Sequence, residues 1–177
     1  MIIFRSRVEF LALLTAAVAA TASNPALAAA WKYRDFSQAP YHSVEAALSA
    51  RDGRALLTIN CSHAGDPTLS IQFRPDADIG LSMGPVVLDW DPPQAAPLGS
   101  KLIWEPHDRG TAARDGSEDR DASDVAETVQ NKAGVLKIVT SDIGGDRSEA
   151  FFDSGDNREA IGRVLAACPW NPKPMKR

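Results

Sequence analysis

The chain has 177 residues, with 19 lysines and arginines against 23 aspartates and glutamates, which gives a formal net charge of −4 at pH 7. A mildly acidic chain lacks the electrostatic footprint that binding to nucleic acid or to anionic lipid requires. We therefore expect no nucleic-acid partner.

Residues 1–30 have the pattern of a secretory signal peptide. A start with two arginines precedes a short apolar run, Phe10 to Ala20, and a small, polar segment then ends in Ala-x-Ala sequences. Cleavage after Ala28 and cleavage after Ala30 both fit. A membrane-spanning helix needs ~20 apolar residues, so this run is too short for an anchor. We expect a periplasmic or secreted protein with no membrane span in the mature chain.

Removal of residues 1–30 would leave 147 residues with a net charge of −5. This is the usual size of one domain, and it is large enough for a hydrophobic core of its own. We predict that residues 31–170 form a single β-rich domain and that residues 171–177 form a flexible tail.

The first half of the mature chain reads as strands joined by short turns. Apolar and polar residues alternate in WKYRDF, SVEAALSA, RALLTINCS and TLSIQFRP, a period of two that is typical of half-buried strands. Asp52-Gly53 is a two-residue hairpin signal in which both residues need positive φ. Leu57, Ile59 and Cys61 share one face of their strand, so Cys61 should point inward.

The second half continues the alternation in MGPVVLDWDPP and SKLIWEP, which places Trp90 in the core. The segment from Pro106 to Ser123 has no apolar period and is predicted to be a mobile loop. VAETVQ and VLKIVTS flank NKAG, so they are predicted to form a further hairpin. About eight strands with short connections indicate a mainly β fold, either an antiparallel two-layer β-sandwich or an open barrel.

The end of the domain changes period. Its apolar residues have the i, i+3, i+4, i+7 spacing of an amphipathic helix: Ile161, Val164, Leu165 and Cys168. Asp156 and Glu159 have a spacing suited to capping the start of a helix. We predict one C-terminal α-helix over residues 156–168, packed against one end of the β domain.

Both cysteines are predicted to face the core, Cys61 from a strand and Cys168 from the helix. In an oxidising compartment we expect a Cys61–Cys168 disulfide. It would close a loop of roughly 100 residues, a constraint worth on the order of 4–5 kcal/mol in the chain-entropy model. We expect no catalytic thiol, because each cysteine lies on an apolar face. His63, two residues after Cys61, is assigned to a turn in SHAGDP.

The sequence predicts no catalytic residue, metal site or cofactor. His42, His63 and His107 are far apart and show no metal-ligand spacing. The acidic segment DGSEDRDASD has the oxygen density that calcium needs, but it lacks the order of a calcium loop and contains Arg120. Signatures of hydrolases are absent as well. The alternative is a hydrolase whose site is assembled from distant loops, around His107 and the acidic segment.

Several positions at the two ends of the mature chain match a family pattern. They are Cys61 after LLTIN, and Phe152, Gly155, Ala160, Ile161, Ala167, Cys168 and Trp170 in FDSGDNREAIGRVLAACPW. The chain resembles the short exported proteins of Gram-negative bacteria that include the VasI-like, type VI secretion-associated group. The resemblance leaves residues 75–145 uncovered. It implies an envelope β-sandwich with a C-terminal helix and a disulfide, and it carries over no functional residue.

We therefore expect an exported, non-enzymatic protein of the cell envelope. It would act as a binding or accessory module for an envelope protein or a peptidoglycan-type partner, through loops or an exposed sheet edge.

Overall fold

The structure is a computed structural model that describes residues 30–38, 42–75, 83–116, 119–142 and 147–169. The predicted signal peptide apart from Ala30, the predicted tail and Trp170 lie outside these residues. The described segments contain nine strands and two helices. In chain order they are β1 Lys32–Asp35, β2 Ser43–Ser49, β3 Leu56–Ser62, β4 Thr68–Arg74, β5 Met83–Asp91, β6 Glu105–His107, β7 Gly110–Arg114, α1 Asp121–Asn131, β8 Val135–Asp142, β9 Arg147–Asp153 and α2 Glu159–Ala167.

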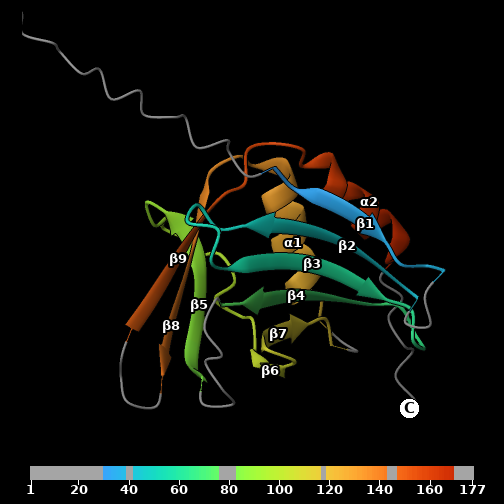
Figure 1. The fold of residues 1–177 in the computed structure, drawn as a ribbon, viewed down its shortest axis with the longest axis horizontal. Helices are drawn as coiled ribbons and strands as arrows, with labels where there is room; N and C mark the ends of the chain where they lie inside the picture. Colours follow the sequence, from blue (N-terminus) through green and yellow to red (C-terminus); the bar gives the residue numbers. More distant parts are fainter. Residues whose placement is uncertain (1–29, 39–41, 76–82, 117–118, 143–146, 170–177) are drawn as a thin grey trace, which may run out of the picture.

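The strands form two antiparallel sheets (Figure 1). The larger sheet has the order β1-β2-β3-β4-β7-β6 and the smaller one has the order β5-β8-β9. The prediction of a mainly β, antiparallel fold built from two sheets is confirmed, and the described strands do not close into a barrel.

The inward face of the larger sheet consists of the apolar residues that the period of two singled out. Leu57, Ile59 and Cys61 in β3 are 2%, 2% and 0% exposed. Ile59 lies opposite Ala46 in β2 and Ile71 in β4, so apolar rows run across neighbouring strands. This continuous apolar face requires a covering layer.

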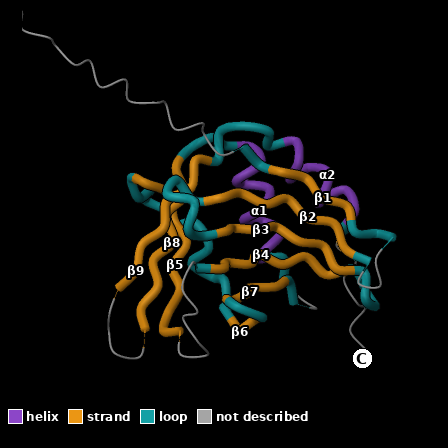
Figure 2. Tube along the Cα trace, viewed as in Figure 1, coloured by secondary structure: helices purple, strands orange, loops and turns teal. Residues whose placement is uncertain are grey.

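The two helices supply that layer. α2 contacts β1, β2 and β3, and α1 contacts β4 and β7, so together they cover one face of the larger sheet (Figures 1 and 2). Ile161 and Val164 of α2 are completely buried there. Among the described residues, no helix lies on the opposite face of β2, β3 and β4, which we call the open face. On that face Asn60 and Gln72 are half-buried, and Thr58 and Ser70 are 5% exposed.

The smaller sheet adjoins one end of the larger one, and its strands run across the direction of β2–β4 (Figure 1). Phe73 of β4 and Phe152 of β9 make an edge-to-face contact with ring centroids 6.4 Å apart. Arg51, in the turn after β2, binds the Asp153 carboxylate through two hydrogen bonds of 2.8 and 2.6 Å. Trp90 is 4% exposed in the shared core, as its phase in the sequence predicted.

The prediction that Pro106–Ser123 forms a mobile loop was wrong. This segment contains most of the β6–β7 hairpin and the first turn of α1. Thr111, Ala112 and Ala113 of β7 are all at most 3% exposed. Their side chains are small, so the burial of β7 leaves no strong apolar period in the sequence.

The predicted hairpin around NKAG was also wrong in its first arm. VAETVQ lies within α1, where Val125, Ala126 and Val129 form the buried stripe. Spacings of one and four residues suit a helix, but Val125 and Val129, four residues apart, would also lie on one face of a strand. The preceding residues decide the case, because the helix begins at Asp121 and already buries Ala122. The fold therefore has two helices, where one was predicted.

Smaller corrections concern the turns and element ends. Residues 101–104 of SKLIWEP are not a strand, and Ile103 is 80% exposed. The turn after β2 has four residues, closed by Ala50 and Ala55, and only Gly53 of the Asp-Gly pair has positive φ. α2 is shorter than predicted, and no side chain caps its start.

No helix in the described part of the chain has both the length and the apolar character that crossing a membrane requires.

Candidate binding site

The open face of the larger sheet carries polar side chains in rows. In β3 and β4, polar residues alternate with the apolar core residues, so the polar side chains point to this side. The antiparallel register then places Asn60 opposite Ser70 and Thr58 opposite Gln72. Gln72 Nε2 donates a hydrogen bond of 3.1 Å to Ser70 Oγ, so the two rows are linked along β4. The face therefore presents hydroxyl and amide groups that both donate and accept hydrogen bonds.

A hollow of about 880 Å³ lies over these rows. Its floor comes from β3 and β4, and residues of the β6–β7 hairpin contribute His107, Asp108 and Arg114 to its lining. Phe36, 41% exposed, lines it beyond the end of β1. This volume is within the range of ~300–1,000 Å³ that is typical of ligand-binding clefts.

The β6–β7 hairpin is seated tightly on β4. His107 pairs with Gly110, so Asp108 and Arg109 form a two-residue loop. A Cβ atom at Gly110 would collide with the carbonyl oxygen of Phe73, so the backbones meet at a distance that only glycine allows. Asp108 has a φ of +49°, a conformation that non-glycine residues rarely adopt. The close contact at Gly110 thus places the loop beside the end of β4.

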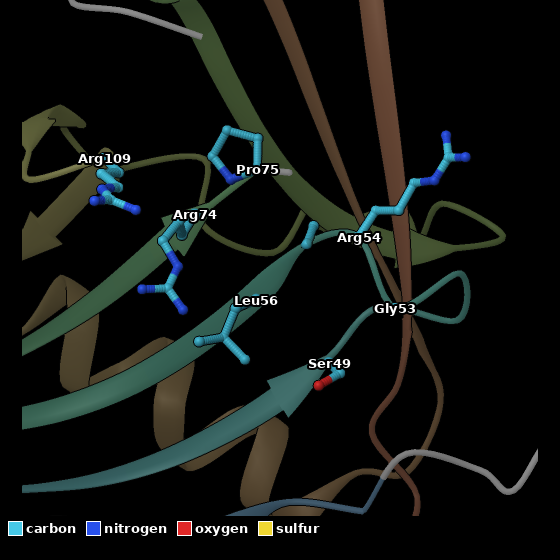
Figure 3. A pocket seen from close by; sticks show the side chains of 8 residues that line it. Ser49, Gly53, Arg54, Leu56, Arg74, Pro75 and Arg109 are labelled. Carbon is cyan, nitrogen blue, oxygen red and sulfur yellow. The ribbon is translucent and has the colours of Figure 1, made fainter. Parts of the chain in front are cut away.

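That position brings arginines from distant segments into a second hollow, of about 320 Å³ (Figure 3). Arg74 comes from the end of β4 and Arg109 from the hairpin loop, and their side chains lie on the same side of the view. Arg54, from the turn after β2, lines the hollow as well, but its guanidinium group extends away from the other two. A smaller hollow shares Arg74 and Arg109 with this one and Gln72 with the polar face, so the two regions adjoin.

The arginines that line this hollow lack the carboxylate partners that other arginines of the described chain have. Arg34 binds Glu45 at 3.0 Å, and Arg51 binds Asp153. Within the described residues, the guanidinium groups of Arg54, Arg74 and Arg109 make no ion pair or side-chain hydrogen bond. Of the residues that the structure describes, three arginines and no carboxylate line the hollow of about 320 Å³, so this hollow favours an anion. A guanidinium group matches the planar geometry of a carboxylate or the oxygens of a phosphate.

The structure brings the two predicted disulfide residues together. Cys61 in β3 and Cys168, directly after α2, form a disulfide with their Cα atoms 5.6 Å apart. His63 follows the end of β3, and its Nε2 lies 3.1 Å from Cys61 Sγ. The bridge ties the helical layer to the inward face of the sheet, on the side opposite the polar rows.

The residues weighed for catalysis or calcium have other partners. His107 Nδ1 lies 3.3 Å from a guanidinium nitrogen of Arg114. Asp115 accepts hydrogen bonds from the backbone N–H of Ser123, at 2.9 Å, and from its hydroxyl, and burial raises the pKa of this carboxyl. Asp115 thereby satisfies a free backbone donor in the first turn of α1. The described segments contain no group of three or more His, Cys, Asp and Glu residues that could hold a metal ion.

Sequence reasoning missed the arginines, because Arg54, Arg74 and Arg109 are separated by twenty or more residues and the overall charge is negative. Only the hairpin that was mistaken for a loop brings Arg109 to Arg74. The strand phase, by contrast, did place Gln72 and Asn60 on the outward face.

Comparison with known proteins gives no relative for this chain: no family model, no curated protein and no solved structure matches it.

Proposed function

We propose that the chain is an exported, non-enzymatic binding module of the cell envelope, periplasmic or secreted, and that its partner binds on the open face of the larger sheet. The partner is an envelope protein or a cell-wall component of the peptidoglycan type. The observation that carries this proposal is the asymmetry of the sheet, which has one face buried under helices and one face left polar and hollowed.

The chemistry of the open face suits binding better than catalysis. Catalysis of hydrolysis needs a nucleophile, a base and an orienting group within hydrogen-bond reach. The floor of the hollow instead offers neutral hydroxyl and amide groups on two adjacent strands. His107, which also lines the hollow, lies 3.3 Å from a guanidinium nitrogen of Arg114. A sheet is a rigid support, so these groups are ordered before a partner arrives, which lowers the entropic cost of binding.

Export is supported by the sequence of residues 1–30 and by the cysteine pair. A disulfide persists in the periplasm or outside the cell, whereas cytosolic thiols are kept reduced. The resemblance to the VasI-like group points to the same compartment, in a Gram-negative bacterium. A role beside type VI secretion would extend the proposal only if a secretion cluster surrounds the gene.

Capture from a periplasmic extract tests the proposal. The wild-type chain should retain a partner without consuming envelope substrates, and the variant N60A/Q72A should lose that partner. The matched control is N131A, which changes an exposed residue at the end of α1 on the opposite side of the sheet. The proposal fails if the chain hydrolyses an envelope substrate and H107A abolishes this activity while the protein stays folded. It fails in its location if fractionation finds the chain in the cytoplasm.

A further inference from the structure

We propose that the open face binds an anionic glycan, with a carboxylate or phosphate of the glycan between Arg74 and Arg109 and its hydroxyl groups along the polar rows of β3 and β4. This rests on the proposed function and deepens it, because it commits the partner to a class of ligand.

The arginine hollow would hold the anionic end of the ligand. Arg74 and Arg109 both line the hollows of about 320 and 130 Å³, so they face a common space. Gly110 fixes their relation, because only a residue without a Cβ lets the hairpin sit this close to Phe73 and Arg74. Among the described residues no carboxylate pairs with either guanidinium group. An anion in this space would accept charge-assisted hydrogen bonds from both guanidinium groups.

The floor of the larger hollow would hold the hydroxyl-bearing part of the ligand. Sugar hydroxyl groups both donate and accept hydrogen bonds, and serine, threonine, asparagine and glutamine side chains do the same. Asn60, Ser70 and Gln72 provide such groups in the hollow of about 880 Å³. The exposed ring of Phe36 lies toward the end of the sheet where Ser43, Ser62 and Thr68 pair, and Arg74 lies at the opposite end. A ligand along β3 and β4 would reach from an apolar ring to a cationic site.

The charge distribution distinguishes a glycan from a uniform polyanion. Asp66 and Asp108 line the larger hollow, so a ligand with a negative charge on every unit would meet carboxylates. Carboxylates are, however, good acceptors for sugar hydroxyl groups. The surface therefore fits a ligand that is rich in hydroxyl groups and sparsely charged.

The test is a calorimetric titration of the full mature chain, with its disulfide intact, at low salt. The probes are oligogalacturonate for carboxylate, phosphomannan for phosphate, dextran as an uncharged glycan and poly-glutamate as an acidic chain without hydroxyl groups. We expect one or both charged glycans to bind roughly tenfold or more tightly than dextran and than poly-glutamate, since a charged hydrogen bond contributes ~1.5–3 kcal/mol. The two charged glycans show which anion the site takes.

The variant R74Q/R109Q should weaken that binding by roughly tenfold or more, because both charged donors are lost. The control R147Q removes an arginine on β9 that lines none of the three hollows and pairs with Glu149 at 3.2 Å, so this variant should bind like the wild type. All three arginine positions are exposed, so equal melting temperatures will show that the variants are folded. Q72A should also weaken binding while leaving the preference for charged glycans.

Equal binding of poly-glutamate, with the same loss in R74Q/R109Q, would overturn the glycan proposal in favour of an acidic protein segment. Absence of glycan binding, or binding that R74Q/R109Q leaves unchanged, would also overturn it. If the envelope extract still yields a partner that N60A/Q72A loses, only the glycan inference has failed. If glycans bind but the chain is cytoplasmic, only the proposed location has failed.

Discussion

The Nε2 atom of His63 lies 3.1 Å from the Sγ atom of Cys61, within the Cys61–Cys168 disulfide. Both sulfurs belong to residues that are at most 6% exposed, whereas His63 is exposed at the end of β3. The imidazole thus places a polar, solvent-exposed group against a buried bridge.

We predict that H63A slows reduction of the disulfide by dithiothreitol several-fold. Attack of the reductant thiolate on Cys168 forms a mixed disulfide and expels Cys61 as a thiolate, which an N–H of His63 can stabilise. The second thiol of dithiothreitol then releases Cys168, and the reductant ends as a cyclic disulfide. Thiol release followed over time measures the rate. H107A is the control, since His107 lies beside Arg114; equal rates for wild type and H63A would show that His63 has no such effect.

Loss of the disulfide should lower stability strongly. The bridge spans 107 positions of sequence, so its removal in C61A/C168A should cost on the order of 4–5 kcal/mol. For a domain of this size that corresponds to a fall in melting temperature on the order of 10 °C. Reductant should lower the melting temperature of the wild type toward that of the variant and leave the variant unchanged. Two reactive thiols in the exported protein without reductant would contradict the account of the bridge.

Asp115 should make stability fall as the pH rises. Burial raises the pKa of Asp115 above its usual value of 3.8, an effect larger than that of its hydrogen bonds with Ser123. The folded protein therefore holds this proton more tightly than the unfolded chain does. The resulting stabilisation is full below pH 3.8 and is lost as the pH rises through the folded pKa.

D115N should remove this dependence, because an amide does not ionise but still accepts a hydrogen bond from the Ser123 N–H. Urea unfolding across the acidic pH range should show the variant gaining stability relative to the wild type above pH 3.8. D115A should lose ~0.5–2 kcal/mol at every pH, because a donor in the first turn of α1 loses its acceptor. A constant difference between D115N and wild type would contradict the raised pKa.

G110A tests how the hairpin is seated. The new Cβ would meet the backbone of Phe73, which cannot move without disturbing β4, so we expect a loss of ~1–3 kcal/mol. Because the shift would separate Arg109 from Arg74, binding of the charged glycan should weaken as well. G155A is the matched control, since a Cβ there meets nothing within 4 Å. Equal stability and binding of G110A and G155A would contradict the tight contact.

The sequence predicted correctly those strands and the helix in which apolar residues repeat at regular spacing. The period of two identified β2, β3 and β4 and predicted that Cys61 points inward. The helical period of the last segment predicted that Cys168 faces the core as well. Those two assignments together predicted the pairing of the cysteines. They also put Asn60 and Gln72 on the outward face, although nothing in the sequence showed that this face stays uncovered.

The missed parts depend on contacts between distant segments. Thr111 to Ala113 are too small to mark β7 as a buried strand, so the hairpin was taken for a loop. Val125 to Val129 fit a strand as well as a helix until the whole of α1 is considered. Arg109 reaches Arg74 only through the close approach at Gly110, which no spacing in the sequence encodes. The candidate site therefore could not be predicted from the sequence, whereas the disulfide could.

The central claim is that the open face of the larger sheet binds the envelope partner. Arginine labelling with phenylglyoxal, with and without the captured partner, tests it most directly, because the modified residues are identified by mass spectrometry. We predict that the partner protects Arg74 and Arg109 and leaves the reaction of Arg163, on α2, unchanged. The claim would be contradicted if Arg74 and Arg109 were labelled equally with and without the partner while the partner protected Arg163 on the helical side.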